Sequence, residues 1–284
     1  MIDVKNLTYS YSKGKKNAIE QISFSVEEGE AFALLGPSGA GKSTTQGILT
    51  GLLPIQQGEA TVAGTDLHHI NRSLFNKIGV SFEQSNVYGK LTALENLEFY
   101  RKLFDSSVVD SMTLLKQVGL DQVAHKRADT FSKGMKHRLT FVRSMLNQPQ
   151  IWFLDEPTTG LDPAIASQIK DIILEKKTAG TTILLTTHNM VLADELSDKV
   201  GFIIDGQLKL VDTPRNLKLR YGEKLVQVEY KTQDSVESRL FSLVDDRERK
   251  QLVEIMNQYE IETMHTREAT LEEIFIKVTG RGLL

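Results

Sequence analysis

The feature that most constrains this chain is a glycine-rich segment between two regular stretches. It follows a short apolar run at 31–35, typical of a buried strand, and precedes a helical pattern that Pro54 stops. The segment, which fits G-x-x-x-x-G-K-[ST], is Gly36, Pro37, Ser38, Gly39, Ala40, Gly41, Lys42, Ser43, Thr44. Its glycines let backbone N–H groups form an anion nest at a helix N-terminus. We therefore predict a phosphate-binding loop, the alternative being a glycine-rich turn with a chance lysine.

Two further apolar runs place acidic and basic groups near that loop. Asp155 and Glu156 follow the run at 151–154, and His188 follows the run at 182–186. Buried strands that alternate with helical patterns favour an α/β fold with a mostly parallel sheet. Ligands of such sheets bind at the carboxyl ends of the strands, where Asp155 suits Mg²⁺ and Glu156 can polarise a water. Taken alone, the Asp-Glu pair is more typical of a solvated strand end.

Four more motifs then appear in an order that resembles one known family. They are Ser81–Gln84 with the Q-loop glutamine, Phe131–Met135 at the signature position, Gly160–Pro163 as the D-loop, and Thr186–His188 with the switch histidine. Over residues 1–222 the chain resembles the ATP-binding subunit of an ABC transporter. The resemblance implies a P-loop ATPase with a mostly parallel core sheet, an N-terminal antiparallel β-subdomain and a helical subdomain at about 86–145.

The same resemblance assigns roles to individual residues. Glu156, His188 and Gln84 are expected to be catalytic, and Ser43, Gln84 and Asp155 to ligand Mg²⁺. The residues expected to bind ATP are Tyr11, Gly36, Pro37, Ser38, Gly39, Ala40, Gly41, Lys42, Ser43, Thr44, Asp155, Ser132, Gly134 and Asp162. Tyr11 is expected to stack on adenine, although Tyr9 is a competing aromatic on the same face of its strand. In isolation, Gln84 is also compatible with an ordinary loop residue and His188 with a surface histidine.

The signature segment departs from the family's LSGGQ sequence. Phe131, Lys133 and Met135 replace the leucine, the first glycine and the glutamine, whereas Ser132 and Gly134 are kept. The retained pair supplies a hydroxyl and a close backbone N–H, so we expect the site to be functional. The resemblance implies that it contacts the γ-phosphate of an ATP held by a second subunit, in a homodimer or in a heterodimer with another ATPase subunit.

The sequence changes character after Gly222. Val226, Val228 and Tyr230 alternate as on a strand, and two amphipathic helical stripes follow at 252–259 and 271–278. Thr270 and Glu273 form a capping-box pattern ahead of the second stripe. We predict a small α+β domain at 223–284 beside the ATP-binding domain at 1–222. The tail has 9 Lys and Arg against 13 Asp and Glu, which disfavours its binding to nucleic acid.

Composition narrows the functional class further. Cysteine is absent, which excludes disulfides and thiol catalysis, and the net charge of −3 gives no reason to expect nucleic acid. No apolar run approaches the length of a membrane span, so a transporter role requires a separate transmembrane permease, with this chain peripheral on the cytoplasmic face of the membrane, or cytoplasmic when isolated.

The leading hypothesis is an ATPase subunit that powers export. Ser-Lys-Gly-Met, Thr-Thr-Gly-Leu-Asp-Pro and the segment 269–275 resemble bacterial ABC-2-type exporters. Alternatives are an ABC importer ATPase, which usually carries a longer β-barrel tail, and a soluble ABC ATPase acting on nucleic acid or the ribosome. A nucleotide kinase or small GTPase shares only the loop at 36–44.

Overall fold

The computed structural model describes residues 1–12, 16–104, 109–232, 235–280 and 282. These residues form two compact units, Met1–Thr213 and Pro214–Gly282. Each unit has its own sheets and core and is considered by itself below. No helix in the described part of the chain is long and apolar enough to cross a membrane.

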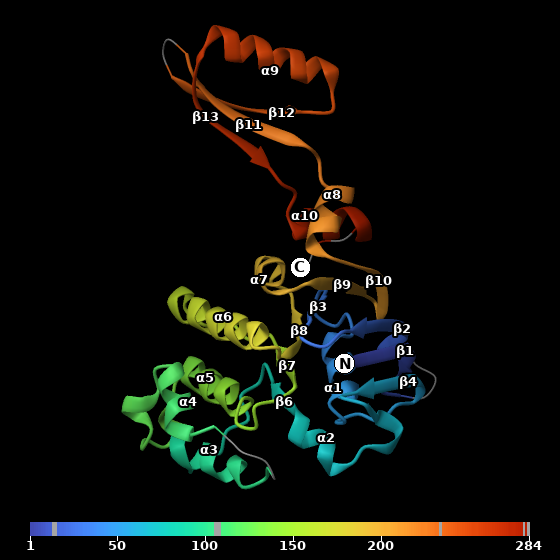
Figure 1. Ribbon diagram of the computed structural model, residues 1–284, viewed down its shortest axis with the longest axis vertical. Coiled ribbons are helices and arrows are strands. Elements are labelled where there is room, and N and C mark those ends of the chain that lie inside the picture. The colour runs from blue at the N-terminus through green and yellow to red at the C-terminus, as the bar shows by residue number, and fades with distance from the viewer. Residues whose placement is uncertain (13–15, 105–108, 233–234, 281, 283–284) are drawn as a thin grey trace. The chain divides into compact units, whose positions relative to one another are not determined.

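A six-stranded sheet forms the centre of the first unit (Figure 1). Its order is β10 (Gln207–Asp212), β9 (Lys199–Ile204), β3 (Ala31–Leu35), β8 (Thr182–Thr187), β7 (Ile151–Asp155), β6 (Ile78–Ser81). Neighbouring strands from β9 to β6 are parallel, and β10 pairs antiparallel with β9. Every residue of β3, β7 and β8 is buried, because helices cover the sheet. The predicted mostly parallel sheet is confirmed.

Three helices of the first unit follow strands of this sheet. Helix α1 (Lys42–Leu49) contacts β8, and α7 (Met190–Leu196) contacts β3 and β8. Helix α6 (Pro163–Thr178) begins with proline at its first position, where the missing N–H costs nothing, and packs on α7. The α1 and α7 helices thus begin at the carboxyl ends of β3 and β8.

A second, antiparallel sheet lies beside the first. Its order is β2 (Ile19–Val26), β1 (Ile2–Tyr9), β4 (Gln57–Val62), β5 (Thr65–Asp66). Burial alternates along β2, as expected for a sheet with one face in the core. The rings of Phe24 on β2 and Phe32 on β3 stack with centroids 4.9 Å apart, so the two sheets share a core. The short helix α2 (Arg72–Lys77) precedes β6.

The chain between β6 and β7 forms helices rather than strands. They are α3 (Ala93–Arg101), α4 (Ser111–Gln117) and α5 (Lys133–Arg143). Thr92 and Glu95 form a capping box at the start of α3. Turns of 3-10 helix at 121–123 and 128–130 lead into α5. These helices lie within residues 86–145, the segment in which the resemblance implies a helical subdomain.

The second unit is a small α+β structure, as its alternating and amphipathic patterns predict. Its elements are α8 (Pro214–Tyr221), β11 (Leu225–Lys231), β12 (Val236–Ser242), α9 (Asp246–Gln258), β13 (Glu260–Arg267), α10 (Leu271–Thr279). The strands form an antiparallel sheet in the order β12-β11-β13, and α9 covers one face (Figure 1). Its core includes Val228, Phe241 and Leu252. The capping box of Thr270 and Glu273 is present at α10.

Candidate active site

The glycine-rich loop connects β3 to α1, and two of its glycines have no room for a side chain. A Cβ on Gly36 would lie 2.2 Å from the Ile203 carbonyl oxygen. Gly41 has φ of 111°, and a Cβ there would lie 2.7 Å from Cγ2 of Ile19. Because glycine has no Cβ, the loop turns tightly and α1 begins directly behind it. The first N–H groups of α1 therefore face the loop, as anion binding requires.

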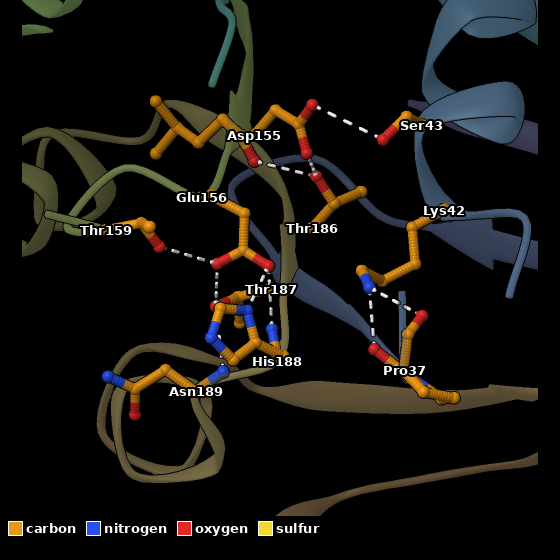
Figure 2. A network of polar contacts seen from close by, with 12 residues as sticks. Pro37, Lys42, Ser43, Asp155, Glu156, Thr159, Thr186, Thr187, His188 and Asn189 are labelled. Carbon is orange, nitrogen blue, oxygen red and sulfur yellow. Dashed lines mark hydrogen bonds and ion pairs between the residues drawn. The ribbon is translucent and has the colours of Figure 1, made fainter. Parts of the chain in front are cut away.

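Lys42 is buried at the start of α1, with its ammonium group inside the loop. Nζ donates to the carbonyl oxygens of Gly36 at 2.6 Å and Pro37 at 3.1 Å (Figure 2). Desolvation lowers the pKa of Lys42, an effect that the nearby Glu156, Asp155 and Glu83 oppose. The lysine thus carries a point charge within reach of any phosphate held by the loop.

Asp155 ends β7 beside the first turn of α1. Its Oδ2 lies 3.5 Å from the Ser43 hydroxyl, and its Oδ1 accepts a hydrogen bond from Thr186. Parallel pairing of β7 and β8 sets this contact, since it places Asp155 opposite Thr186. Burial raises the pKa of Asp155, and Glu156 adds to the rise, while the Thr186 hydrogen bond opposes it. The Ser43 hydroxyl and the Asp155 carboxylate thus bring two oxygen atoms close to one point.

Glu156 is buried, with a left-handed backbone (φ 48°) that side chains seldom adopt. Its Oε2 accepts from the hydroxyls of Thr187 at 2.9 Å and Thr159 at 3.1 Å. Its Oε1 accepts from the backbone N–H of His188 at 2.9 Å and lies 2.7 Å from Nδ1 of that ring (Figure 2). Neighbouring segments therefore hold this carboxylate in one orientation.

The His188 ring is more than half exposed, at 56%, and its contact with Glu156 determines its tautomer. A carboxylate only accepts hydrogen bonds, so Nδ1 carries the proton and donates it to Oε1. In the neutral ring Nε2 then holds a lone pair. Donation from Nε2 to a phosphate oxygen therefore requires the imidazolium form, a condition that the sequence did not reveal.

Known proteins resemble this chain in sequence. A family model described as "ABC transporter" matches residues 19–159. A fluoroquinolones export ATP-binding protein of Mycobacterium tuberculosis (strain CDC 1551) is 45% identical over 287 residues, spanning 100% of this chain and 94% of that protein. The chain belongs to the ABC transporter family. It is an ATPase subunit of an ABC exporter, as the resemblance of its motifs predicted.

Two further comparisons agree with this assignment. A linearmycin resistance ATP-binding protein of Bacillus subtilis is 34% identical over 226 residues, with 78% of this chain and 72% of that protein covered. The dimeric ATP-binding cassette MJ0796, in a post-hydrolysis state bound to ADP and Pi, superposes with a TM-score of 0.69 at 26% identity. The match covers 75% of this chain and 98% of that one. The ABC ATPase fold and its ATP binding are thus established for this chain.

In this ABC ATPase, Tyr11 rather than Tyr9 lies beside the phosphate loop. The Tyr11 hydroxyl lies 3.1 Å from Oγ1 of Thr44, and 65% of the residue is exposed. Tyr9 is buried and packs edge-to-face against Tyr11, with ring centroids 5.1 Å apart. An exposed ring at this position is open to a planar ligand. The two aromatics of the sequence pattern therefore have different environments.

The other residues predicted to contact ATP or the metal lie on other helices and loops of the ABC ATPase. Gln84 is exposed just after β6, at the same carboxyl edge of the sheet as Asp155. Ser132 is the N-cap of α5, where its hydroxyl accepts from the Met135 N–H at 3.2 Å. Gly134 follows within the first turn, and Asp162 is the N-cap of α6. Their roles toward ATP stay predictions.

Several polar residues that contact the site residues had no assigned role. The sequence pattern includes Thr186 and Thr187 only as the residues before His188, and Thr159 only within the Thr-Thr-Gly-Leu-Asp-Pro segment that resembles exporters. The sequence signal that could have indicated these residues is a run of hydroxyl side chains at the ends of buried strands. Glu83, next to Gln84, was also missed, although its charge acts on both Lys42 and Asp155.

Proposed function

We propose that two copies of this ABC ATPase enclose two Mg-ATP molecules, and that hydrolysis drives export of an aromatic antimicrobial compound through a separate permease. The supporting observation is the meeting of the phosphate loop with the carboxylates of Asp155 and Glu156 at the carboxyl end of the parallel strands. Loop, carboxylates and histidine are what phosphoryl transfer to water requires: anion binding, charge neutralisation and an oriented nucleophile.

In this proposal Glu156 orients and polarises the attacking water. The hydroxyls of Thr159 and Thr187 and the two N–H groups of His188 fill the acceptor positions of its carboxylate, so one of these contacts gives way when the carboxylate accepts from the water. Lys42 donates one of its three N–H groups to a phosphate oxygen. As an imidazolium, His188 donates from Nε2 to the γ-phosphate while Nδ1 remains on Glu156.

The residues present fit Mg²⁺. Magnesium prefers oxygen ligands, and ATP sites usually supply one or two of them from the protein, with phosphates and water completing the shell. Ser43 and Asp155 meet this need, together with Gln84 at the same sheet edge. Among the described residues no group of three or more His, Cys, Asp or Glu is placed to hold a metal. When bound, Mg²⁺ neutralises charge on the β- and γ-phosphates.

The second copy is expected to contribute the start of α5. Gly134 is only partly buried and Ser132 is exposed, so the hydroxyl, backbone N–H groups and positive helix end are open to an anion. A γ-phosphate held by the other subunit is the anion we propose. The dimer is a homodimer or a heterodimer with a second ATPase subunit.

An aromatic cluster on the helical subdomain is proposed to face the permease. Tyr88 and Phe99 are 48% and 44% exposed and pack edge-to-face at 5.1 Å. The Tyr100 ring lies 6.1 Å from that of Tyr88 and 4.4 Å from the guanidinium carbon of the buried Arg143 of α5, which donates to the Asn86 carbonyl oxygen at 2.8 Å. A contact on this surface therefore reaches the segment after Gln84 and the helix α5, whose N-cap is Ser132.

The identity of the transported compound is proposed from the relative that matches the whole chain. That protein is named for fluoroquinolone export, so a planar, weakly charged aromatic antimicrobial is the substrate class we favour. The ATPase is then peripheral on the cytoplasmic face of the membrane, held there by the permease, with no role in binding nucleic acid.

Purification of the affinity-tagged chain from detergent-solubilised membranes of its own host tests this proposal. We expect an integral membrane polypeptide to co-purify, and Mg-dependent ATPase activity in the complex. Reconstituted in inside-out vesicles, the complex is expected to accumulate norfloxacin when ATP is present. Co-purification with ribosomes or RNA instead of a membrane polypeptide would refute the proposal.

A further inference from the structure

Gln46 is a buried polar residue on α1, one turn after Lys42, and only 2% of it is exposed. Its Oε1 lies 3.0 Å from Oγ1 of Thr186, the residue whose hydroxyl contacts Asp155. Its Nε2 is buried and has no hydrogen-bond partner among the residues that the structure describes. A buried amide NH₂ group without an acceptor is rare in folded proteins, so its orientation needs an explanation.

The Thr186 hydroxyl is surrounded by three oxygen atoms. Besides Gln46 Oε1 at 3.0 Å, it faces the Leu154 carbonyl oxygen at 3.3 Å and Oδ1 of Asp155. A hydroxyl has one hydrogen, so it satisfies only one of these acceptors at a time. The cluster therefore lacks a donor at Thr186, while the NH₂ group of Gln46 lacks an acceptor.

We propose that the Gln46 amide presents its NH₂ group to Thr186, and that Gln46 is thereby a positioning residue for Asp155. The two ends of an amide have nearly the same shape, and rotation exchanges them. Nε2 then donates to Thr186 Oγ1, and the hydroxyl hydrogen is left for Asp155 Oδ1. The other oxygen, Oδ2, is held toward Ser43. The inference rests on the proposed function, in which Asp155 and Ser43 ligand the metal of Mg-ATP.

Metal binding by the full-length chain tests the inference without turnover. Binding of Mn²⁺, as a paramagnetic substitute for Mg²⁺, is measured by electron paramagnetic resonance with the non-hydrolysable analogue AMP-PNP. Loss of a partner that orients a metal ligand costs about tenfold in metal affinity, which is the weakening expected for Gln46→Leu. Affinity for AMP-PNP in EDTA is expected to stay unchanged. Gln46→Met, an unbranched apolar replacement, serves if the leucine variant does not fold.

A matched control and a double-mutant cycle separate positioning from packing. Thr50 is buried at the C-cap of the same helix, and its hydroxyl donates to the carbonyl oxygens of Gln46 and Gly47, so Thr50→Val is expected to retain wild-type Mn²⁺ affinity. In a Thr186→Val background, Gln46→Leu is expected to cause no further loss, because the residue it acts through is gone. An unchanged affinity in Gln46→Leu, or the same loss in both backgrounds, would overturn the inference. Absence of Mn²⁺ binding by the wild-type chain with AMP-PNP would overturn the proposed metal site as well.

Discussion

Glu156 combines a strained backbone with a carboxylate that neighbouring groups hold in place. Its positive φ is costly for any residue with a side chain, yet it directs the carboxylate toward Thr159, Thr187 and His188. Strain of this kind persists only where the surroundings determine the conformation. Packing alone does not require a charged group here, which favours a role in the reaction.

Replacing Glu156 by glutamine is expected to slow ATP hydrolysis by about 10²–10³-fold, because the side chain keeps its shape but no longer polarises water as a base. ATP affinity should remain, since the phosphate loop is untouched. Steady-state phosphate release and nucleotide titration measure the two properties. Glu195→Gln, which removes only the exposed ion pair with Lys170, is the control and should hydrolyse ATP normally. Unchanged turnover in Glu156→Gln would exclude Glu156 as the base.

Asp155 is expected to lower the stability of the fold at neutral pH. Burial raises its pKa, so the folded state binds the proton more tightly than the unfolded state, and the carboxylate subtracts stability once pH exceeds both pKa values. Asp155→Asn should therefore raise the melting temperature at pH 7 by about 2–4 °C, with a smaller gain as pH falls toward the ordinary carboxyl range.

Differential scanning fluorimetry in EDTA, without nucleotide, measures this effect. Asp198→Asn is the comparison, because Asp198 accepts from the Ala31 N–H and pairs with Lys177, and its loss should give no stabilisation. A melting temperature for Asp155→Asn at or below that of the wild type would contradict the prediction.

At the scale of helices and strands, much of the predicted site lies at the N-termini of helices. The segment before α1 was predictable because Gly36 and Gly41 mark a tight turn within a few residues. The contacts that link Asp155 to Thr186 and Gln46 were not predictable, because they form only when β7 and β8 pair in parallel and α1 packs on β8. The hydrogen-bond partners of Glu156 could not be predicted for the same reason, since Thr187 lies on another strand, 31 residues away.

Ser132 gives a prediction at this scale, since it is both an N-cap and a proposed contact to ATP of the other subunit. Ser132→Ala is expected to cost about 1 kcal/mol of stability and to cut hydrolysis strongly, while the isolated chain binds ATP as before. Thr270→Ala removes the comparable N-cap of α10 and should lose stability without losing activity. Weaker ATP binding by monomeric Ser132→Ala would contradict the role across the dimer.

The whole molecule consists of two units with separate cores, which should respond separately to mutation. Phe241 is fully buried in the second unit, in the core formed with Val226, Val228 and Leu252. Phe241→Ala is expected to destabilise that unit by about 3–5 kcal/mol and leave ATP affinity unchanged. Calorimetry should then resolve an early transition that ATP does not shift. A single transition that ATP raises as a whole would show that the units unfold together.

The contacts of Lys42 have a consequence for anion selectivity. Gly36 and Pro37 accept two of the three N–H groups of its ammonium group, so a phosphate oxygen can accept from the third while both carbonyls stay bound. A chain of phosphates can contact the loop N–H groups and this remaining N–H together, whereas a small single anion reaches fewer of these donors at once. We therefore expect the loop to bind polyphosphates more tightly than small single anions.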